Sequence, residues 1–175
     1  AAAIDVPLLL DADALTVLAE DSAARAAVAS RTSPTLLTPH DGEYARLTGH
    51  PVGPDRVGAA RELARSLGAV VLLKGSSTVV APPEGAAYVV LSAPPELATA
   101  GSGDVLAGLA GSLLAHHQAV GPLDDAGAAR IAAVAAHVHG LAGSVAADGG
   151  RTVTSLDVVH ALPAAVARVR SPRST

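Results

Sequence analysis

Short apolar runs alternate along this chain with longer segments of helical periodicity, and this alternation restricts the possible folds more than any other feature. Three of the runs end at polar or turn-forming residues and are predicted to be buried strands, at 7–10, 35–37 and 70–73. Helical patterns lie between them, at 13–20, 23–29, 41–47 and 54–67. Strands that alternate with helices are typical of βαβ units. The chain is therefore predicted to have an α/β fold with a mostly parallel central sheet.

The second half of the chain predicts a β-hairpin followed by three helices. The expected elements are hairpin strands at 78–81 and 88–91 and helices at 104–117 and 126–147. Thr154 and Asp157 resemble a capping box that opens a last helix, which Pro163 is expected to kink or restart. Pro54 suits the first turn of the helix that it begins. Because the sequence has no internal repeat and no dividing linker, residues 1–175 are interpreted as a single domain.

Charge and composition exclude several classes of function. The formal net charge is −4, and no run of Lys and Arg suggests binding to nucleic acid. With no cysteine in the chain, disulfides and thiolate metal sites are excluded. No apolar run approaches the length of a membrane span, and the first residues lack the charged segment of a secretory signal. These features predict a soluble cytoplasmic protein with no nucleic-acid or membrane partner.

A glycine-rich turn precedes the helix expected at 104–117. Gly101, Ser102, Gly103 and Asp104 stand where the loop becomes helix. Glycines let backbone N–H groups approach a ligand closely, and the first turn of a helix attracts phosphate. A carboxylate at that point can take a proton from a hydroxyl group that attacks a phosphoryl group. Taken alone, the same residues also fit an ordinary helix cap.

Polar clusters follow each of the three predicted buried strands. Lys74, Gly75, Ser76, Ser77 and Thr78 follow the third strand and could hold a nucleotide, although a strand-end lysine often lies in solvent. The corresponding residues after the second strand are His40, Asp41 and Glu43, and those after the first are Asp11 and Asp13. His40 could bind a substrate, Glu43 could contact the water of a metal ion, and paired carboxylates could serve Mg²⁺ through water. Helix starts would explain both acidic clusters equally simply.

These clusters are expected to lie along one edge of the sheet. In open α/β sheets, ligands bind beyond the carboxyl ends of the strands. Four independent helix caps at those points are possible, but a shared binding site is the more economical interpretation.

In this order, the motifs resemble those of a known family. The segments are LDADAL at 10–15, LTPHDGE at 37–43, LKGSST at 73–78, ATAGSGDVL at 98–106 and HGLAG at 139–143. Together they resemble the ADP/ATP-dependent NAD(P)H-hydrate dehydratases, the carbohydrate-kinase-like domain of the YjeF family. The resemblance covers nearly the whole chain, whereas the glycine turn alone is shared with ribokinase-like kinases more widely.

The resemblance implies a three-layer αβα ribokinase-like fold and an enzyme that repairs hydrated NADH and NADPH. The S epimer would be dehydrated at the expense of ADP or ATP, with Mg²⁺ expected from the chemistry. It implies that His40 and Asp104 contact the hydrate and that Asp104 is the base. Residues 74–78 and Gly103 would bind the adenine nucleotide, and the amides of Gly101, Ser102 and Gly103 would form an anion hole. No metal ligands are assigned, and a homo-oligomer is expected.

The sequence departs from the family pattern in two ways. Ser102 stands where Thr is commoner, which keeps the hydroxyl group. The family's early strands, with their glycine motif, have no counterpart here, so the domain is expected to be partial. The alternatives are a small-molecule kinase of the same fold, acting on a hydroxymethylpyrimidine, a thiazole or a sugar, and a non-catalytic module that senses nucleotide or only assembles into oligomers.

Overall fold

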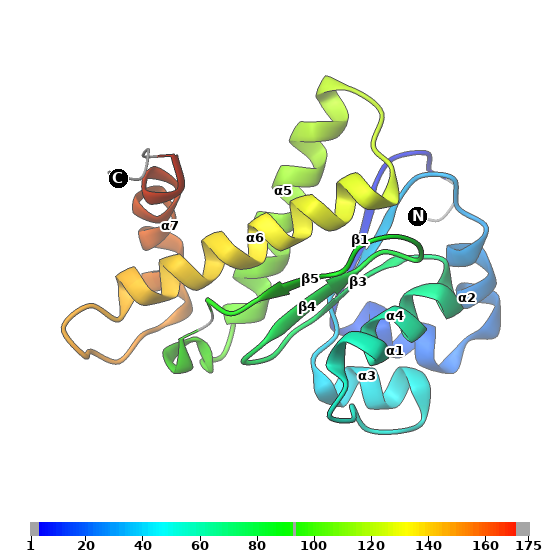
Figure 1. The fold of residues 1–175 in the computed structure, drawn as a ribbon, viewed down its shortest axis with the longest axis horizontal. Helices are drawn as coiled ribbons and strands as arrows, with labels where there is room; N and C mark the ends of the chain where they lie inside the picture. Colours follow the sequence, from blue (N-terminus) through cyan, green and yellow to red (C-terminus); the bar gives the residue numbers. More distant parts are fainter. Residues whose placement is uncertain (1–3, 93, 171–175) are drawn as a thin grey trace.

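A single five-stranded sheet lies between two layers of helices in the computed structural model, which describes residues 4–92 and 94–170 (Figure 1). The strands are β1 (Leu8–Leu10), β2 (Thr35–Leu37), β3 (Val70–Leu73), β4 (Thr78–Ala81) and β5 (Tyr88–Val90). The α-helices are α1 (Asp13–Glu20), α2 (Ser22–Ala29), α3 (Asp41–Thr48), α4 (Arg56–Leu67), α5 (Ser102–Val120), α6 (Asp125–Ala146) and α7 (Ser155–Arg170). A short 3₁₀ helix, η1, covers Pro95–Leu97.

The sheet is mixed, with the strands in sequence order from β1 to β5. β1, β2 and β3 run parallel, joined by the helical crossovers that the alternating pattern predicted. β3, β4 and β5 pair antiparallel because short loops connect them. The parallel half of the sheet is therefore the half that carries the polar clusters at its carboxyl edge.

Alternate strand residues face the two helical layers, which makes the fold a three-layer αβα sandwich. Leu37, Val71 and Leu73 pack against the layer that contains α1, α3 and α4. Their neighbours Leu36 and Val70 face the opposite layer, built from α5 and α6. Both sets of side chains are almost fully buried. The short apolar runs are thus strands covered on both faces, as their lack of polar alternation indicates.

The last helix forms a smaller core of its own with α6. Val138, Ala142 and Ala146 of α6 pack against Val158 and Ala161 of α7. In Figure 1, α7 lies beyond the sheet, against the end of α6 that is distant from the strands.

Helix boundaries differ from the sequence expectation at two prolines. Helix α4 begins at Arg56 and is capped by Asp55, so Pro54 precedes the first turn that it was expected to occupy. Helix α7 continues through Pro163 without restarting. The capping box is confirmed, because Thr154 N donates to Asp157 Oδ2 at 2.9 Å and Asp157 N donates to Thr154 Oγ1 at 3.3 Å.

Among the described residues, no helix combines the length and the apolar composition needed to cross a membrane.

Candidate functional site

The three parallel strands deliver one polar cluster each to the same edge of the sheet. Asp11 directly follows β1, Thr38 follows β2, and Lys74 follows β3. The backbone links two of these ends, because Lys74 N donates to Pro39 O at 2.8 Å. Parallel pairing in register therefore brings the ends of all three strands together, as the sequence predicts.

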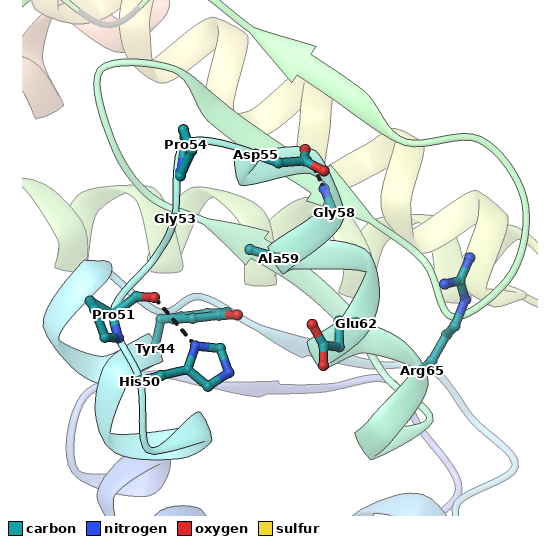
Figure 2. Close-up of a pocket in the computed structure, with 10 residues that line it drawn as sticks. All are labelled: Tyr44, His50, Pro51, Gly53, Pro54, Asp55, Gly58, Ala59, Glu62 and Arg65. Carbon is teal, nitrogen blue, oxygen red and sulfur yellow. Dashed lines mark hydrogen bonds between the residues drawn. The ribbon is translucent and has the colours of Figure 1, made fainter.

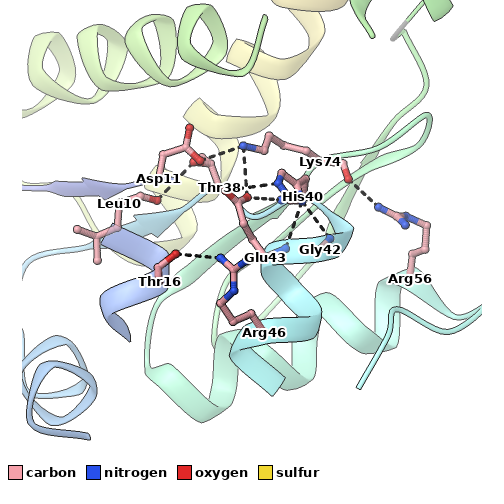
Figure 3. Close-up of polar contacts among 10 residues, drawn as sticks. All are labelled: Leu10, Asp11, Thr16, Thr38, His40, Gly42, Glu43, Arg46, Arg56 and Lys74. Carbon is pink, nitrogen blue, oxygen red and sulfur yellow. Dashed lines mark hydrogen bonds and ion pairs between the residues drawn. The ribbon is translucent and has the colours of Figure 1, made fainter. Parts of the chain in front are cut away.

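Lys74 is the central charge of this edge (Figure 3). Its ammonium Nζ lies 2.9 Å from Asp11 Oδ1 and 3.7 Å from Glu43 Oε2. The three side chains are only 18%, 13% and 10% exposed, so these ion pairs are screened less than surface pairs. A Cβ atom placed on Gly103 would lie 3.5 Å from Lys74 Nζ. The glycine turn thus joins the strand ends in one site, with Lys74 beside it.

The two ring nitrogens of His40 have different partners. Nδ1 accepts hydrogen bonds from Gly42 N at 3.0 Å and Glu43 N at 3.2 Å, which caps helix α3. Glu43 completes the capping box, because its Oε2 accepts from His40 N at 2.8 Å. Since Nδ1 accepts, the proton of the neutral ring is on Nε2. Nε2 lies 3.6 Å from Glu43 Oε1, and the side chain is 59% exposed, so a ligand could reach the Nε2 proton in competition with Glu43.

The loop that follows Lys74 offers free backbone donors. Gly75 and Ser76 are exposed. Among the described residues, no hydrogen bond involves the N–H groups of Gly75, Ser76 or Ser77. Thr78 is buried at the start of β4, where its Oγ1 donates to Gly75 O at 3.2 Å. Its hydroxyl therefore shapes the loop, while the three amides can face a nucleotide.

The glycine turn has the backbone that its composition predicted. Gly101 has a φ of 82°, in the left-handed region that favours glycine. Ser102 N donates to Thr99 O at 3.2 Å, whereas the amides of Gly101, Gly103 and Asp104 have no partner in the part of the chain that the structure describes. Asp104 is exposed in the first turn of α5. No described residue makes a hydrogen bond or an ion pair with its carboxylate, which is thus free to meet a substrate hydroxyl.

Behind the turn, Ser102 contacts a histidine on α6. Ser102 Oγ lies 3.3 Å from His139 Nε2, and both residues are buried. Burial lowers the pKa of His139 below the ordinary value of 6.5. The Ser102 hydroxyl therefore faces the protein interior. Its amide already donates to Thr99 O, so of the three amides expected in an anion hole, those of Gly101 and Gly103 have no partner among the described residues.

The structure brings Asp11, Glu43, Lys74 and Gly103 together, with His40 bonded to Glu43, while the role of each residue remains a prediction. Asp11 was predicted as a possible contact of Mg²⁺ from its place after a strand, but its pairing with Lys74 was not, since Lys74 is distant in the chain. Two further contributors were not assigned to the site from the sequence. Arg56 and His139 carry no local signal, because their partners are set by tertiary packing.

Near Asp11 the backbone is strained. Ala12 has a φ of 50°, the single positive value among the described non-glycine residues. Its ψ is −118°, and such a sparsely populated conformation costs an L-residue about 1–3 kcal/mol. It stands directly between Asp11 and the start of α1, at the edge where Lys74 is held.

A pocket of about 560 Å³ lies elsewhere, between α3 and α4 (Figure 2). Tyr44, His50, Asp55, Glu62 and Arg65 are among the residues that line it. The ring of His50 meets that of Tyr44 edge-on, with the ring centroids 5.8 Å apart. None of the residues assigned to the candidate site lines this pocket.

The chain matches the family model of NAD(P)H-hydrate dehydratase over residues 1–164. A curated ADP-dependent (S)-NAD(P)H-hydrate dehydratase from Neisseria meningitidis is 42% identical over 92% of this chain and 52% of its own length. A bifunctional NAD(P)H-hydrate repair enzyme from Thermofilum pendens is also 42% identical, over 97% of this chain and 31% of its own length. The chain therefore spans about half or less of these relatives.

Solved structures agree with the sequence comparison. The ADP/ATP-dependent NAD(P)H-hydrate dehydratase of Bacillus subtilis, co-crystallised with ATP and Mg²⁺, has a TM-score of 0.76 and is 32% identical. The match covers 94% of this chain and 55% of that one. A hydroxyethylthiazole kinase from Pyrococcus horikoshii shares the fold, with a TM-score of 0.63 and 20% identity. With its ribokinase-like fold and a match along almost its entire length, this chain belongs to the NAD(P)H-hydrate dehydratase family.

Proposed function

We propose that the protein dehydrates the S epimer of hydrated NADH and NADPH at the expense of ADP or ATP. One observation carries the proposal: Lys74, held between two carboxylates, lies beside a glycine turn that ends in the free carboxylate of Asp104. A cation and unpaired amides can bind phosphoryl oxygens, while the carboxylate can accept a proton. The relatives named for this activity support the same conclusion.

The chemistry divides into a transfer and an elimination. Asp104 takes the proton of the hydrate hydroxyl, whose oxygen then bonds to the terminal phosphorus of the nucleotide, while the bond from that phosphorus to the departing AMP or ADP breaks. The new phosphate ester leaves as inorganic phosphate, the adjacent carbon loses a proton, and the ring double bond is restored. Phosphorylation is needed because hydroxide is a far poorer leaving group than phosphate.

In this reaction the nucleotide is held by the loop at 74–78 and the hydrate by His40. The free amides of Gly75, Ser76 and Ser77 supply donors for the nucleotide, with Gly103 close to Lys74 Nζ. Nε2–H of His40 can donate to the hydrate. Positioning of the two reactants supplies much of the rate enhancement in phosphoryl transfer.

Magnesium would enter with the nucleotide. Mg²⁺ usually keeps several waters and is bound through phosphates and one or two carboxylates. Asp11 and Glu43 lie at this edge, where their carboxylates could accept hydrogen bonds from the waters of the Mg²⁺ ion. Among the described residues, no group of three or more Asp, Glu or His side chains could hold a metal ion. When bound, the ion would neutralise charge on the transferred phosphoryl group.

Replacing Asp104 by Asn tests the assignment of the base. In the full-length protein, Asp104→Asn should lower turnover of the hydrate by about 100-fold to 10,000-fold, the usual contribution of a general base. Binding of ATP, measured by calorimetry, should be retained because Asp104 touches the hydrate. Asp125→Asn, which replaces the acidic residue in the first turn of α6, is the matched control and should leave turnover unchanged. Full turnover by Asp104→Asn would remove Asp104 from this role.

We also propose that the protein assembles into a homo-oligomer. Leu156, Val159, Val166 and Val169 are exposed on one side of α7, and a large apolar patch on a protein surface often marks an interface. Light scattering of the full-length protein should give a mass that is a multiple of one chain. A Val159→Lys, Val166→Lys double variant should shift it toward one chain, and a monomeric wild-type protein would contradict this part of the proposal.

A further inference from the structure

Arg56, the first residue of α4, joins two separate parts of the proposed site. Its Nη2 donates to Lys74 O at 2.9 Å, and its Nε donates to Ser77 O at 3.3 Å. Its Nη1 donates to both carboxylate oxygens of Asp41, at 2.9 and 3.1 Å. One guanidinium therefore binds both ends of the loop at 74–77 and the first residue of α3. Figure 3 shows the contact with Lys74.

Because a peptide bond is planar and trans, these contacts also orient the loop amides. The N–H of a residue points opposite to the carbonyl of the residue before it. When Arg56 binds the carbonyl of Lys74, the N–H of Gly75 is turned away from the guanidinium. That N–H is one of the three loop amides with no partner among the described residues. The arginine thus fixes the direction in which this donor points.

A side chain at position 75 would displace the guanidinium of Arg56 from these contacts. A Cβ atom on Gly75 would lie 2.6 Å from Nη2 of Arg56, which is too short for a real contact between such atoms. Gly75 does not have a positive φ, so left-handed backbone does not explain its glycine. The space that the guanidinium occupies does explain it.

We infer that Arg56 is a positioning residue, which keeps the nucleotide loop and the His40 turn in one fixed relation. Asp41 directly follows His40, so the ion pair with Arg56 sets where the His40 turn stands relative to the loop. Phosphoryl transfer is sensitive to such placement, because a misplacement of 1 Å can cost about 100-fold in rate. The inference rests on the proposed role of the loop in binding nucleotide.

Two substitutions of Arg56 in the full-length protein test the inference. Arg56→Gln should raise the Kd for ATP about tenfold and speed hydrogen exchange of the amides at 74–78. It should also raise the KM for nucleotide and lower kcat, whereas a loss of folded protein alone would lower kcat without changing KM. Arg56→Lys should not restore either value, since one ammonium cannot span two carbonyls and a carboxylate.

Matched variants separate this effect from general damage to α4. Arg65 lies on the same helix and is exposed, and its side chain makes no hydrogen bond with a described residue. The Arg65→Gln variant should therefore behave as wild type. Asp41→Asn weakens only the link to α3 and should lower kcat with a smaller change in the Kd for ATP. If Arg56→Gln fails to fold, the inference is tested by measuring loop hydrogen exchange and the Kd for ATP in Arg56→Lys and Asp41→Asn.

Unchanged loop exchange and an unchanged Kd in folded Arg56 variants would overturn the inference. Failure of the proposed function can be distinguished from failure of this inference. A wild-type protein that binds ATP without repairing the hydrate still allows loop hydrogen exchange and the Kd for ATP to be measured. Exchange and nucleotide binding thus report on Arg56 independently of the reaction.

Discussion

Single residues at the carboxyl edge of the sheet serve the fold and the proposed site together. His40 caps α3 through Nδ1, while its Nε2 lies on an exposed side chain, 3.6 Å from Glu43 Oε1 and within reach of a ligand. Helix capping and substrate binding, which are alternatives in the sequence, are therefore compatible in the structure. Thr78 also serves both the fold and the proposed site, because its hydroxyl donates to the carbonyl of Gly75 and so shapes the proposed nucleotide loop.

Residues whose partners lie nearby in the chain could be predicted, and those with distant partners could not. A φ suited to glycine at Gly101 follows from its position before a helix. Asp11 and Lys74 are 63 residues apart, and nothing local in the sequence pairs them. His139 lies in one of the motifs that resemble the family, but its contact with Ser102 could not be predicted because it depends on how α6 crosses α5.

His139 predicts a pH dependence of stability. Burial lowers its pKa in the folded state, so below the ordinary value of about 6.5 the unfolded chain binds a proton that the folded chain does not. Stability should therefore fall as the pH falls from neutral toward about pH 5. The free energy of unfolding in urea, measured across this range for His139→Gln and wild type, should fall less steeply for the variant.

His117→Gln provides the control for that experiment. His117 is exposed near the end of α5, so this variant should keep the pH slope of the wild type. Equal slopes for His139→Gln and wild type would show that the buried imidazole is protonated equally in both states.

At the scale of elements, close packing of α6 against the segment after β5 depends on glycine. A Cβ atom on Gly140 would lie 2.2 Å from the backbone oxygen of Ser92, which cannot move as a side chain can. Gly140→Ala should destabilise the protein by about 1–3 kcal/mol, the usual cost of overpacking. Chemical denaturation measures this difference.

Gly108→Ala on α5 is the matched helical substitution. Nothing lies within 4 Å of a Cβ atom at Gly108, so the better helix propensity of alanine should stabilise the protein by up to about 1 kcal/mol. Similar losses of stability in the two variants would mean that packing at Gly140 is not the cause.

Most elements could be predicted from the sequence because their signals are local. Apolar runs set β1, β2 and β3, and Gly68 ends α4 with a φ of 57°. The prolines were harder to interpret. Pro54 lies ahead of the cap at Asp55, and packing of α7 on α6 keeps the helix continuous through Pro163. Tertiary contacts override the local preference at such points.

At the scale of the whole molecule, the site is divided between distant parts of one sheet edge. Asp104, the proposed base, stands on α5, while Lys74 follows β3 and His40 follows β2. Such a site works only when the strands are in register, so activity and folding should be lost together. The family model matches residues 1–164, a range that contains all of these segments.

Repair of hydrated NADH by the full-length protein tests the central claim most directly. The S epimer is incubated with ADP or ATP and Mg²⁺, and the absorbance of the reduced nicotinamide and the release of phosphate are followed together. We expect absorbance to return only when nucleotide is present, with one phosphate released for each NADH recovered. Absence of recovery, or accumulation of a stable phosphorylated product as from a kinase, would contradict the proposed function.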